Sequence, residues 1–303
     1  MENTNKCPSV DDIEKLKKYI GWGSLSKAFP NSDDSFVSDS WRSRNTELKD
    51  LLTDAEYSDV KASITDSFYT PDFIISAMWA IAARLGQNNG VVLEPSCGNG
   101  KFMYQAPTPE NMRFVGVEKD SLSARIAKFI NHSNSYIFET GFEKLPLQQS
   151  CFDLVIGNPP YGDYSINLQD FMEYNRFSIH NQFILKSLQS LKNNRYAIYV
   201  VSRYVLDSTD SQARKEMSCL ADLVGAFRLP NGAFKDGSTS NTEVITDILV
   251  FKRKCANDES FARENYGSQY VSYPDWVNLH ILILMYHPFL FVPYQSFLFL
   301  THH

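Results

Sequence analysis

Short apolar stretches alternate with helical patterns along the middle of the chain. The apolar run from Val91 to Leu93 ends in Glu94-Pro95 and a glycine-rich turn, which predicts a buried strand followed by a loop. Further strands are predicted over residues 113–120, 135–140, 152–158, 195–202, 223–230 and 246–254. Short apolar strands separated by helices are typical of a mostly parallel sheet covered on both faces. We therefore expect a doubly wound α/β fold with a seven-stranded sheet.

Three helices are predicted around these strands. An apolar face from Leu122 to Ile130 predicts a helix over 121–133, which we expect Ser121 to cap. A second helix is predicted over 180–194. A third is predicted over 70–86, because proline stands near its start and glycine just past its end.

The two ends of the chain differ from this central pattern. Residues 1–66 are expected to form a helical N-terminal extension, and residues 67–256 the α/β domain. Residues 257–303 form an atypical apolar tail that is rich in aromatic residues and broken by Pro288 and Pro293. We interpret this tail either as a docking segment or as a foreign end left by truncation or frameshift, and we favour the second interpretation.

Charge distribution and cysteine spacing indicate which partners and which cellular compartment to expect. The 303 residues are 43% hydrophobic with a net charge of −6, but residues 176–254 hold 12 Lys and Arg against 7 Asp and Glu. That region is either a basic surface or a set of solvated charges. The five cysteines are scattered and never spaced as CxxC, and the N-terminus is polar, so we expect a cytoplasmic protein without a signal peptide. The uninterrupted apolar run in the tail is shorter than the roughly 20 residues that a transmembrane helix needs.

Polar residues follow the predicted first and second strands at their carboxyl ends, where open α/β sheets bind ligands. Gly98 and Gly100 allow the backbone to approach a ligand, and the turn lacks the Lys-Ser/Thr ending of a triphosphate-binding loop. Glu118 ends the second strand and can accept hydrogen bonds from both hydroxyls of a ribose. These residues favour a nucleotide-like ligand without a triphosphate.

The segment Asn158-Pro159-Pro160-Tyr161 follows the predicted fourth strand. An amide oxygen and a backbone carbonyl, fixed by adjacent prolines, suit a planar amino group. Tyr161 offers a flat face on which a base can stack. The arrangement therefore predicts attack by an amino nitrogen on an electrophilic methyl group, with no metal, thiol or Ser-His pair required.

Five segments together resemble the S-adenosylmethionine-dependent DNA adenine-N6 methyltransferases. They are FYTP (68–71), EPSCGNG (94–100), VGVEKD (115–120), GFEKLP (141–146) and FDLVIGNPPYG (152–162). The resemblance is greatest to the N-terminal methylase module of phage and mobile-element proteins in which a methylase is joined to a helicase. It implies a class I, Rossmann-like methyltransferase fold, S-adenosyl-L-methionine as cofactor, and DNA as substrate.

The resemblance also implies roles for individual residues. Those expected to bind the cofactor are Phe68, Tyr69, Thr70, Glu94, Ser96, Cys97, Gly98, Gly100, Glu118, Phe142 and Asn158. Those expected in the catalytic segment are Asn158, Pro159, Pro160 and Tyr161. Glu118 would hold the ribose and Phe142 would pack on the adenine ring of the cofactor. Tyr161 and Phe234 would contact the two faces of a target adenine flipped out of the duplex.

Other functions remain open at this point. An NPPY segment also occurs in methyltransferases that act on protein glutamine or on RNA amino groups. A third possibility is a catalytically silent cofactor- or DNA-binding module, because the sequence after residue 254 resembles neither a target-recognition domain nor a helicase. Such domains would then be missing partners of this chain.

Overall fold

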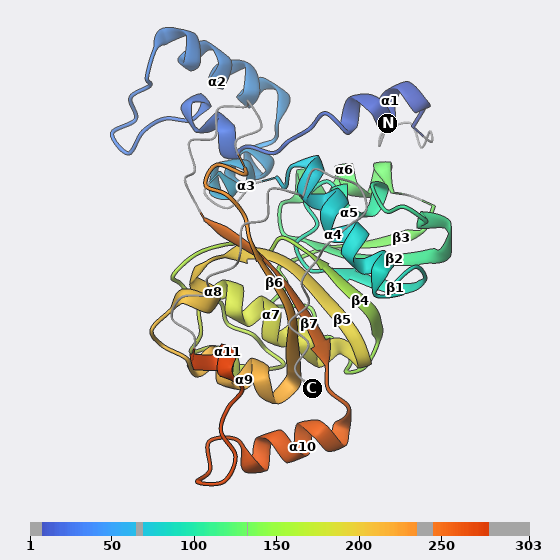
Figure 1. Ribbon diagram of the computed structural model, residues 1–303. Helices are drawn as coiled ribbons and strands as arrows, with labels where there is room; N and C mark the ends of the chain where they lie inside the picture. Colours follow the sequence, from blue (N-terminus) through green and yellow to red (C-terminus); the bar gives the residue numbers. More distant parts are fainter. Residues whose placement is uncertain (1–7, 65–68, 132, 235–244, 279–303) are drawn as a thin grey trace.

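A computed structural model describes residues 8–64, 69–131, 133–234 and 245–278 (Figure 1). One seven-stranded sheet has the order β3-β2-β1-β4-β5-β7-β6. Its strands are β1 (Gly90–Glu94), β2 (Met112–Glu118), β3 (Ser135–Glu139), β4 (Phe152–Gly157), β5 (Leu191–Ser202), β6 (Ala221–Arg228) and β7 (Thr246–Arg253). The pairs from β3 to β5 are parallel, and β7 runs antiparallel to both of its neighbours. The predicted doubly wound, mostly parallel sheet of seven strands is confirmed.

Helices connect the strands and also form the N-terminal part of the described chain (Figure 1). Before the sheet come α1 (Val10–Leu16), the 3-10 helix η2 (Gly23–Ala28), α2 (Asp39–Leu51), α3 (Asp54–Ser63) and α4 (Asp72–Arg84). Between the strands lie α5 (Lys101–Tyr104), η3 (Pro109–Asn111), α6 (Ser121–Ile130), η4 (Met172–Tyr174), α7 (Ile179–Ser190), α8 (Tyr204–Asp207) and α9 (Gln212–Leu220). After the sheet come α10 (Ala256–Asn265) and α11 (Asp275–Asn278).

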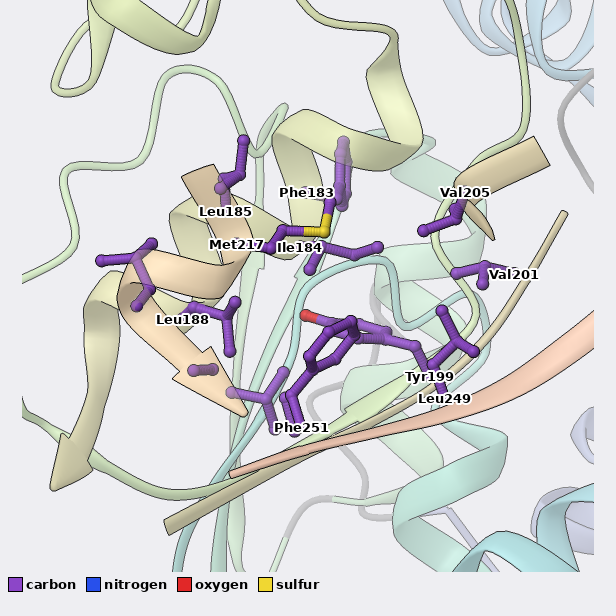
Figure 2. Packing of buried hydrophobic residues seen from close by; sticks show 14 of the residues in the cluster. Phe183, Ile184, Leu185, Leu188, Tyr199, Val201, Val205, Met217, Leu249 and Phe251 are labelled. Atoms are coloured by element: carbon purple, nitrogen blue, oxygen red, sulfur yellow. The ribbon is translucent and has the colours of Figure 1, made fainter. Parts of the chain in front are cut away.

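Two hydrophobic clusters cover the two faces of the sheet. Neighbouring strand residues such as Leu154 and Val155 belong to different clusters, because side chains alternate between the faces of a strand. One cluster includes α4 and α6, and the other includes α7 and α9. Figure 2 shows the second cluster, in which Phe183 and Met217 lie over Tyr199 and Phe251 of the sheet. Each such buried side chain stabilises the fold by about 1.5–3 kcal/mol.

The N-terminal helices pack against α6 of the α/β domain. A small cluster of Ala28, Phe29 and Val60 joins η2 to α3. Glu56 of α3 forms an ion pair with Arg125 of α6, and the same carboxylate completes a capping box with Thr53. This contact places α3 beside the loops at the carboxyl edge of the sheet.

Two local predictions were wrong. Asp120 and not Ser121 is the N-cap of α6, because its carboxylate accepts a 2.8 Å hydrogen bond from the backbone N–H of Ser123. The predicted helix over 180–194 ends at Ser190, and the next four residues begin β5. Leu191 pairs with Phe152 of β4, so pairing within the sheet overrides the local helical pattern.

The first part of the predicted tail packs on the domain. Val277 is fully buried, and its carbonyl accepts a 2.8 Å hydrogen bond from the Nε of Arg214 in α9. Trp276 contacts Phe251 edge to face, with 6.0 Å between ring centroids. Residues 279–303 of the tail lie outside the described residues. Within the described ranges, none of the helices has the length and hydrophobicity that crossing a bilayer requires.

Candidate functional site

A cavity of about 280 Å³ lies at the carboxyl ends of the parallel strands. The strand order reverses between the neighbouring strands β1 and β4, which is the position where open α/β sheets bind ligands. The predicted site residues that line the cavity are Tyr69, Thr70, Glu94, Ser96, Cys97, Gly98, Glu118, Phe142, Asn158 and Pro160. The structure therefore brings together most of the residues that the sequence singled out.

The glycine-rich turn after β1 lines the cavity next to Glu118. Gly98 and Gly100 have φ values of +53° and +75°, which side chains other than glycine rarely adopt. A Cβ atom at Gly98 would lie 3.1 Å from the Tyr69 hydroxyl oxygen. The backbone N–H of Gly98 donates a 2.8 Å hydrogen bond to Oε2 of Glu118. Because Gly98 has no side chain, Tyr69 can pack against the turn while the backbone of the turn is hydrogen-bonded to Glu118.

Glu118 is held in place by two backbone donors. Besides the Gly98 N–H, the N–H of Asp120 donates a 2.8 Å hydrogen bond to Oε1. Burial raises the pKa of Glu118 to about 7, although both hydrogen bonds oppose that rise. The carboxyl group is consequently fixed in orientation and changes its charge near neutral pH.

Glu94 stands at the end of β1 and faces the same cavity. Its side chain is only 2% exposed, and burial together with nearby Glu118 raises its pKa well above the usual range. Among the residues that the structure describes, its Oε2 atom has no hydrogen-bond partner. A buried carboxyl oxygen without a partner is energetically unfavourable, so this atom suits a hydrogen-bond donor supplied by a ligand.

The end of β4 is tied to the turn after β1. The hydroxyl of Ser96 donates a 2.8 Å hydrogen bond to the main-chain carbonyl of Asn158. Asn158 and Pro160 line the cavity, whereas Pro159 is buried and lies outside the lining. The rigid Asn-Pro-Pro segment therefore meets the cavity directly beside Glu94 and Ser96.

The remaining predicted residues that the structure describes lie outside the cavity lining. Tyr161 packs partly buried against the core cluster that contains α7, and its hydroxyl donates a 3.1 Å hydrogen bond to the Val200 carbonyl. Phe234 packs partly buried against the cluster on the other face of the sheet. Gly100 is the N-cap of α5. Phe68 lies outside the described residues.

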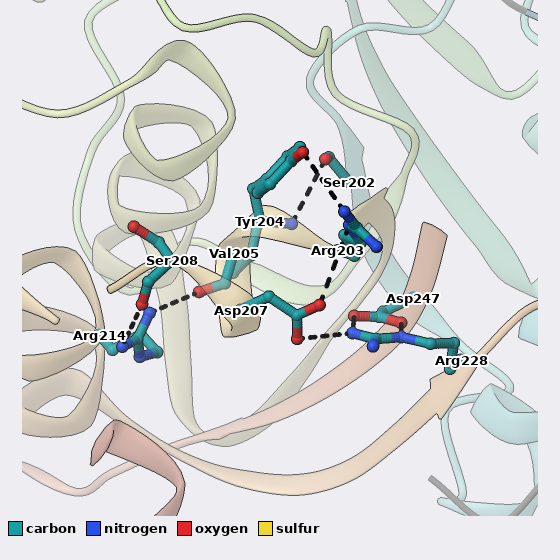
Figure 3. A network of polar contacts seen from close by, with 9 residues as sticks. All are labelled: Ser202, Arg203, Tyr204, Val205, Asp207, Ser208, Arg214, Arg228 and Asp247. Atoms are coloured by element: carbon teal, nitrogen blue, oxygen red, sulfur yellow. Dashed lines mark hydrogen bonds and ion pairs between the residues drawn. The ribbon is translucent and has the colours of Figure 1, made fainter. Parts of the chain in front are cut away.

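A network of charged side chains joins the strands that follow Tyr161 (Figure 3). The guanidinium of Arg228, the last residue of β6, contacts Asp247 of β7 at 2.9 Å and Asp207 of α8 at 2.8 Å. Arg203 and Tyr204 lie beside them, with the Arg203 guanidinium 5.1 Å from the Tyr204 ring centroid. This network fixes the end of β6, from which the chain continues to Phe234.

Several lining residues were missed by the sequence reasoning. Asp59 and Ala62 reach the cavity from α3, and Glu143 and Tyr164 reach it from the loops after β3 and β4. Tyr19 does not line the cavity, but its hydroxyl lies 3.3 Å from Ser123 Oγ, as does that of Tyr69. Glu143 lies in the GFEKLP segment, but no role was expected for it, and the other residues named here reach the site through tertiary packing.

The lining is rich in acidic side chains. It holds five carboxylates and two lysines, namely Asp59, Glu94, Glu118, Asp120 and Glu143 with Lys101 and Lys119. Lys101 is engaged by Asp72 at 2.7 Å and by the Thr70 carbonyl. Within the described parts of the chain, no group of His, Cys, Asp and Glu is arranged as metal ligands would be. The raised pKa of Glu94 reduces its charge, but the other four acidic side chains still outnumber the two lysines, so the lining favours a ligand that carries positive charge.

Comparison with known proteins agrees with the motifs. Residues 99–222 match the family described as Eco57I restriction-modification methylase. This part of the chain is similar to the restriction-modification methylases. The match includes the end of the glycine-rich turn, Glu118 and the Asn-Pro-Pro-Tyr segment. The resemblance to methyltransferases that the sequence predicted is confirmed at the level of this family.

Two relatives are similar to this chain in sequence. The chain is 28% identical over 191 residues to the defense against restriction protein B of Escherichia phage P1, covering 61% of this chain and 8% of that protein. It is 35% identical over 95 residues to the type II methyltransferase M.CvrRI of Paramecium bursaria Chlorella virus XZ-6E, covering 31% of this chain and 24% of that protein. The chain thus spans only a small part of the length of these relatives.

A solved structure shares the fold of the methylase domain. It is a class I S-adenosylmethionine-dependent methyltransferase from Listeria monocytogenes, with a TM-score of 0.54, 15% identity and coverage of 83% of both chains. The fold is therefore that of the class I methyltransferases, as the motifs predicted.

Proposed function

We propose that this chain transfers a methyl group from S-adenosyl-L-methionine to the N6 amino group of an adenine in DNA. The observation that carries the proposal is the position of Asn158 at the β1–β4 switch point, where Ser96 holds its carbonyl. A rigid pair of acceptors beside an acidic, nucleotide-sized cavity suits methyl transfer to an amino nitrogen. The match to restriction-modification methylases and the type II methyltransferase relative support DNA as the substrate.

The acceptor groups of the cavity fit the proposed cofactor. S-adenosylmethionine carries an ammonium and a sulfonium against one carboxylate, so its net charge is positive. An ammonium beside Glu94 would favour its charged form, whose unpartnered Oε2 would then accept a hydrogen bond from the ammonium. Glu118 would accept from the ribose hydroxyls. The acidic lining thus complements both the charge and the hydroxyl groups of the cofactor.

The role that we assign to the residues of this chain is to position the target amino group for methyl transfer. The cofactor supplies a methyl group made electrophilic by its sulfonium. The Asn158 amide oxygen and the Pro159 carbonyl would each accept a hydrogen bond from one N–H of the target amino group. Their dipoles favour the charge that develops on nitrogen as it becomes pyramidal, and the nitrogen releases its proton to solvent after the transfer. No covalent enzyme intermediate is needed.

The target base has to leave the duplex to reach Asn158. Tyr161 is anchored through its hydroxyl to Val200 and is partly buried. We propose that the base stacks on one face of its ring. Stacking of this kind contributes about 1–3 kcal/mol per base. We propose that Phe234 contacts the other face, at the end of the segment that follows β6.

A comparison of possible methyl-accepting substrates tests this function. The protein is incubated with methyl-labelled S-adenosylmethionine and, separately, with DNA, RNA and a glutamine-containing protein substrate, in parallel with Asn158→Ala. Label in DNA that is lost in Asn158→Ala supports the proposal. Label confined to RNA or protein contradicts it, and cofactor binding without transfer to any acceptor would identify a silent module.

A further inference from the structure

Two solvent-accessible side chains follow β5 at the carboxyl edge of the sheet. Gly157, the last residue of β4, pairs with Tyr199 of β5, and the two strands are parallel. β5 continues for about 10 Å beyond that pair before the chain reaches Arg203 and Tyr204. These two residues therefore lie at the same edge as Asn158, on the neighbouring strand, and further out along the strand direction.

The Arg203 guanidinium lies over an exposed aromatic ring (Figure 3). Its carbon atom is 5.1 Å from the centroid of the Tyr204 ring, and Nη2 donates a 3.5 Å hydrogen bond to the Tyr204 hydroxyl. The Arg203 side chain is 38% exposed, and Tyr204 is 56% exposed. The ring thus orients the guanidinium while both groups stay accessible to a partner.

The carboxylates beside this pair are held by a second arginine. The Arg228 guanidinium contacts Asp247 at 2.9 Å and Asp207 at 2.8 Å, whereas Nε of Arg203 lies 4.0 Å from Asp207. Asp247 is completely buried. Of these four charged side chains, that of Arg203 is the most exposed. The network therefore presents a positive charge to the solvent.

The same network adjoins the tyrosine of the Asn-Pro-Pro-Tyr segment. The Tyr161 hydroxyl is bonded to the Val200 carbonyl, and Val200 pairs with Ile248, which follows Asp247 in β7. Val200 also precedes Arg203 by three positions. When a base is flipped toward Tyr161, its sugar and phosphates remain outside the pocket. They would then lie at the edge that carries Arg203.

A cation at this edge would offset the charge of the cavity. The cavity lining holds more acidic side chains than lysines, which opposes the approach of DNA phosphates. A guanidinium can donate two parallel hydrogen bonds to one phosphate. We propose that Arg203 binds a DNA phosphate beside the flipped adenine, and that Tyr204 orients this guanidinium and stacks on a neighbouring base. The proposal rests on the proposed function, since it names residues with which that site would hold its DNA.

The salt dependence of DNA binding tests the phosphate contact. Fluorescence anisotropy is measured with a labelled duplex of mixed sequence that carries a mismatched adenine, because a mismatched base costs least to flip. Each phosphate contact contributes about 0.9 to the slope of log affinity against log salt concentration. Between about 50 and about 200 mM salt, the affinity of the unmodified protein should fall about three- to fourfold further than that of Arg203→Ala. Arg203→Lys keeps the charge and should keep the slope.

Arg176→Ala is the matched control. The Arg176 side chain is 57% exposed, its guanidinium lies 4.7 Å from the centroid of the Phe177 ring, and it contacts Glu216 of α9 at 3.1 Å. Glu216 also contacts Arg263 of α10, which follows β7 at the opposite edge of the sheet. Arg176→Ala should therefore leave both the DNA affinity and the salt slope unchanged.

The contribution of Tyr204 is measured at a fixed salt concentration. Loss of a stacked base lowers affinity about fivefold or more, so Tyr204→Ala should bind the duplex more weakly by that factor. Tyr204→Phe keeps the ring and should bind nearly as well as the unmodified protein. All variants should retain their affinity for S-adenosylhomocysteine, because neither Arg203 nor Tyr204 lines the cavity.

The outcomes separate this inference from the proposed function. An unchanged salt slope in Arg203→Ala, or an equal reduction in Arg176→Ala, overturns the phosphate contact. Full DNA affinity in Tyr204→Ala overturns the stacking contact. In each of these cases the unmodified protein still binds DNA, and the proposed function stands. A protein that binds no DNA contradicts the proposed function and the inference together.

Discussion

The Ser96 hydroxyl donates a 2.8 Å hydrogen bond to the main-chain carbonyl of Asn158, and so connects the turn after β1 to the segment after β4. The two strands are neighbours in the sheet, but the residues are 62 positions apart in the sequence. The side that would hold the cofactor and the side that would hold the target amino group are thereby joined by one contact.

Removal of the Ser96 hydroxyl should affect turnover more than cofactor binding. A neutral hydrogen bond contributes about 0.5–1.5 kcal/mol, so Ser96→Ala is expected to lower kcat by roughly twofold to tenfold because Asn158 is less well fixed. Cofactor affinity should change less. Ser96→Thr keeps the hydroxyl and serves as the control. Unchanged kcat in Ser96→Ala, measured under saturating cofactor, would show that the contact does not position Asn158.

Cofactor binding should strengthen as pH rises through neutrality. Burial places the pKa of Glu118 at about 7, and the charged form is the better acceptor for ribose hydroxyls and the better partner for a cation. The affinity for S-adenosylhomocysteine is expected to rise between about pH 6 and 8, and Glu118→Gln should flatten most of that dependence. An affinity that falls over this interval would contradict the role of Glu118.

The same group links stability to pH in the opposite direction. Its usual pKa is 4.5, and in the folded state it is raised to about 7. The folded protein therefore retains a proton that the unfolded chain releases. This contribution to stability is complete below about pH 4.5 and is lost as pH rises to about 7, which denaturant titrations of the ligand-free protein can follow.

Gly98 should be more sensitive to substitution than a glycine of the same backbone conformation elsewhere. Gly98→Ala is expected to lower the free energy of unfolding by about 1 kcal/mol and also to weaken cofactor binding, because the new methyl group approaches the Tyr69 hydroxyl at the cavity. Gly86, with a φ of +73° and open space around its Cα, is the matched control. Gly86→Ala should lose similar stability but keep its cofactor affinity; equal effects on affinity would remove Gly98 from the site.

Much of the fold could be predicted because the strands are short apolar runs with clear breaks. The ends of these runs predict from the sequence alone that Glu94, Glu118 and Asn158 lie at one edge of the sheet. The N-cap of α6 could not be assigned in the same way, since Asp120 and Ser121 are both good capping residues and the backbone geometry decides between them. The end of α7 was misplaced because pairing between Leu191 and Phe152 depends on residues distant in the sequence.

The parts of the site that escaped prediction share one property. Glu143 and Asp59 reach the cavity through the fold-back of a turn and the docking of α3. Glu143 lies in the GFEKLP segment, but neither the fold-back nor the docking leaves a periodic pattern in the sequence. Tyr161 was identified by its motif, but the sequence gives no indication that its hydroxyl is bonded to Val200. Local signals thus find residues at strand ends, whereas contacts between loops require the structure.

Lys186 should be important for stability although it lies outside the cavity lining. Its buried ammonium donates to two carbonyls and to Asp170 at 2.8 Å, so Lys186→Met leaves three acceptors without their donor. We expect a loss of about 3 kcal/mol in the free energy of unfolding, measured by denaturant titration. The exposed pair of Lys128 and Glu139 provides the control, and Lys128→Met should cost at most about 1 kcal/mol. Equal losses in the two variants would contradict the structural role of Lys186.

The position of the transferred methyl group tests the central claim most directly. DNA of mixed sequence is incubated with S-adenosylmethionine carrying a deuterated methyl group, digested to nucleosides and examined by mass spectrometry. The account predicts labelled N6-methyldeoxyadenosine with the unmodified protein, and none with an Asn158→Ala variant that still binds S-adenosylhomocysteine. Label on cytosine alone, or undiminished adenine label in Asn158→Ala, would contradict it.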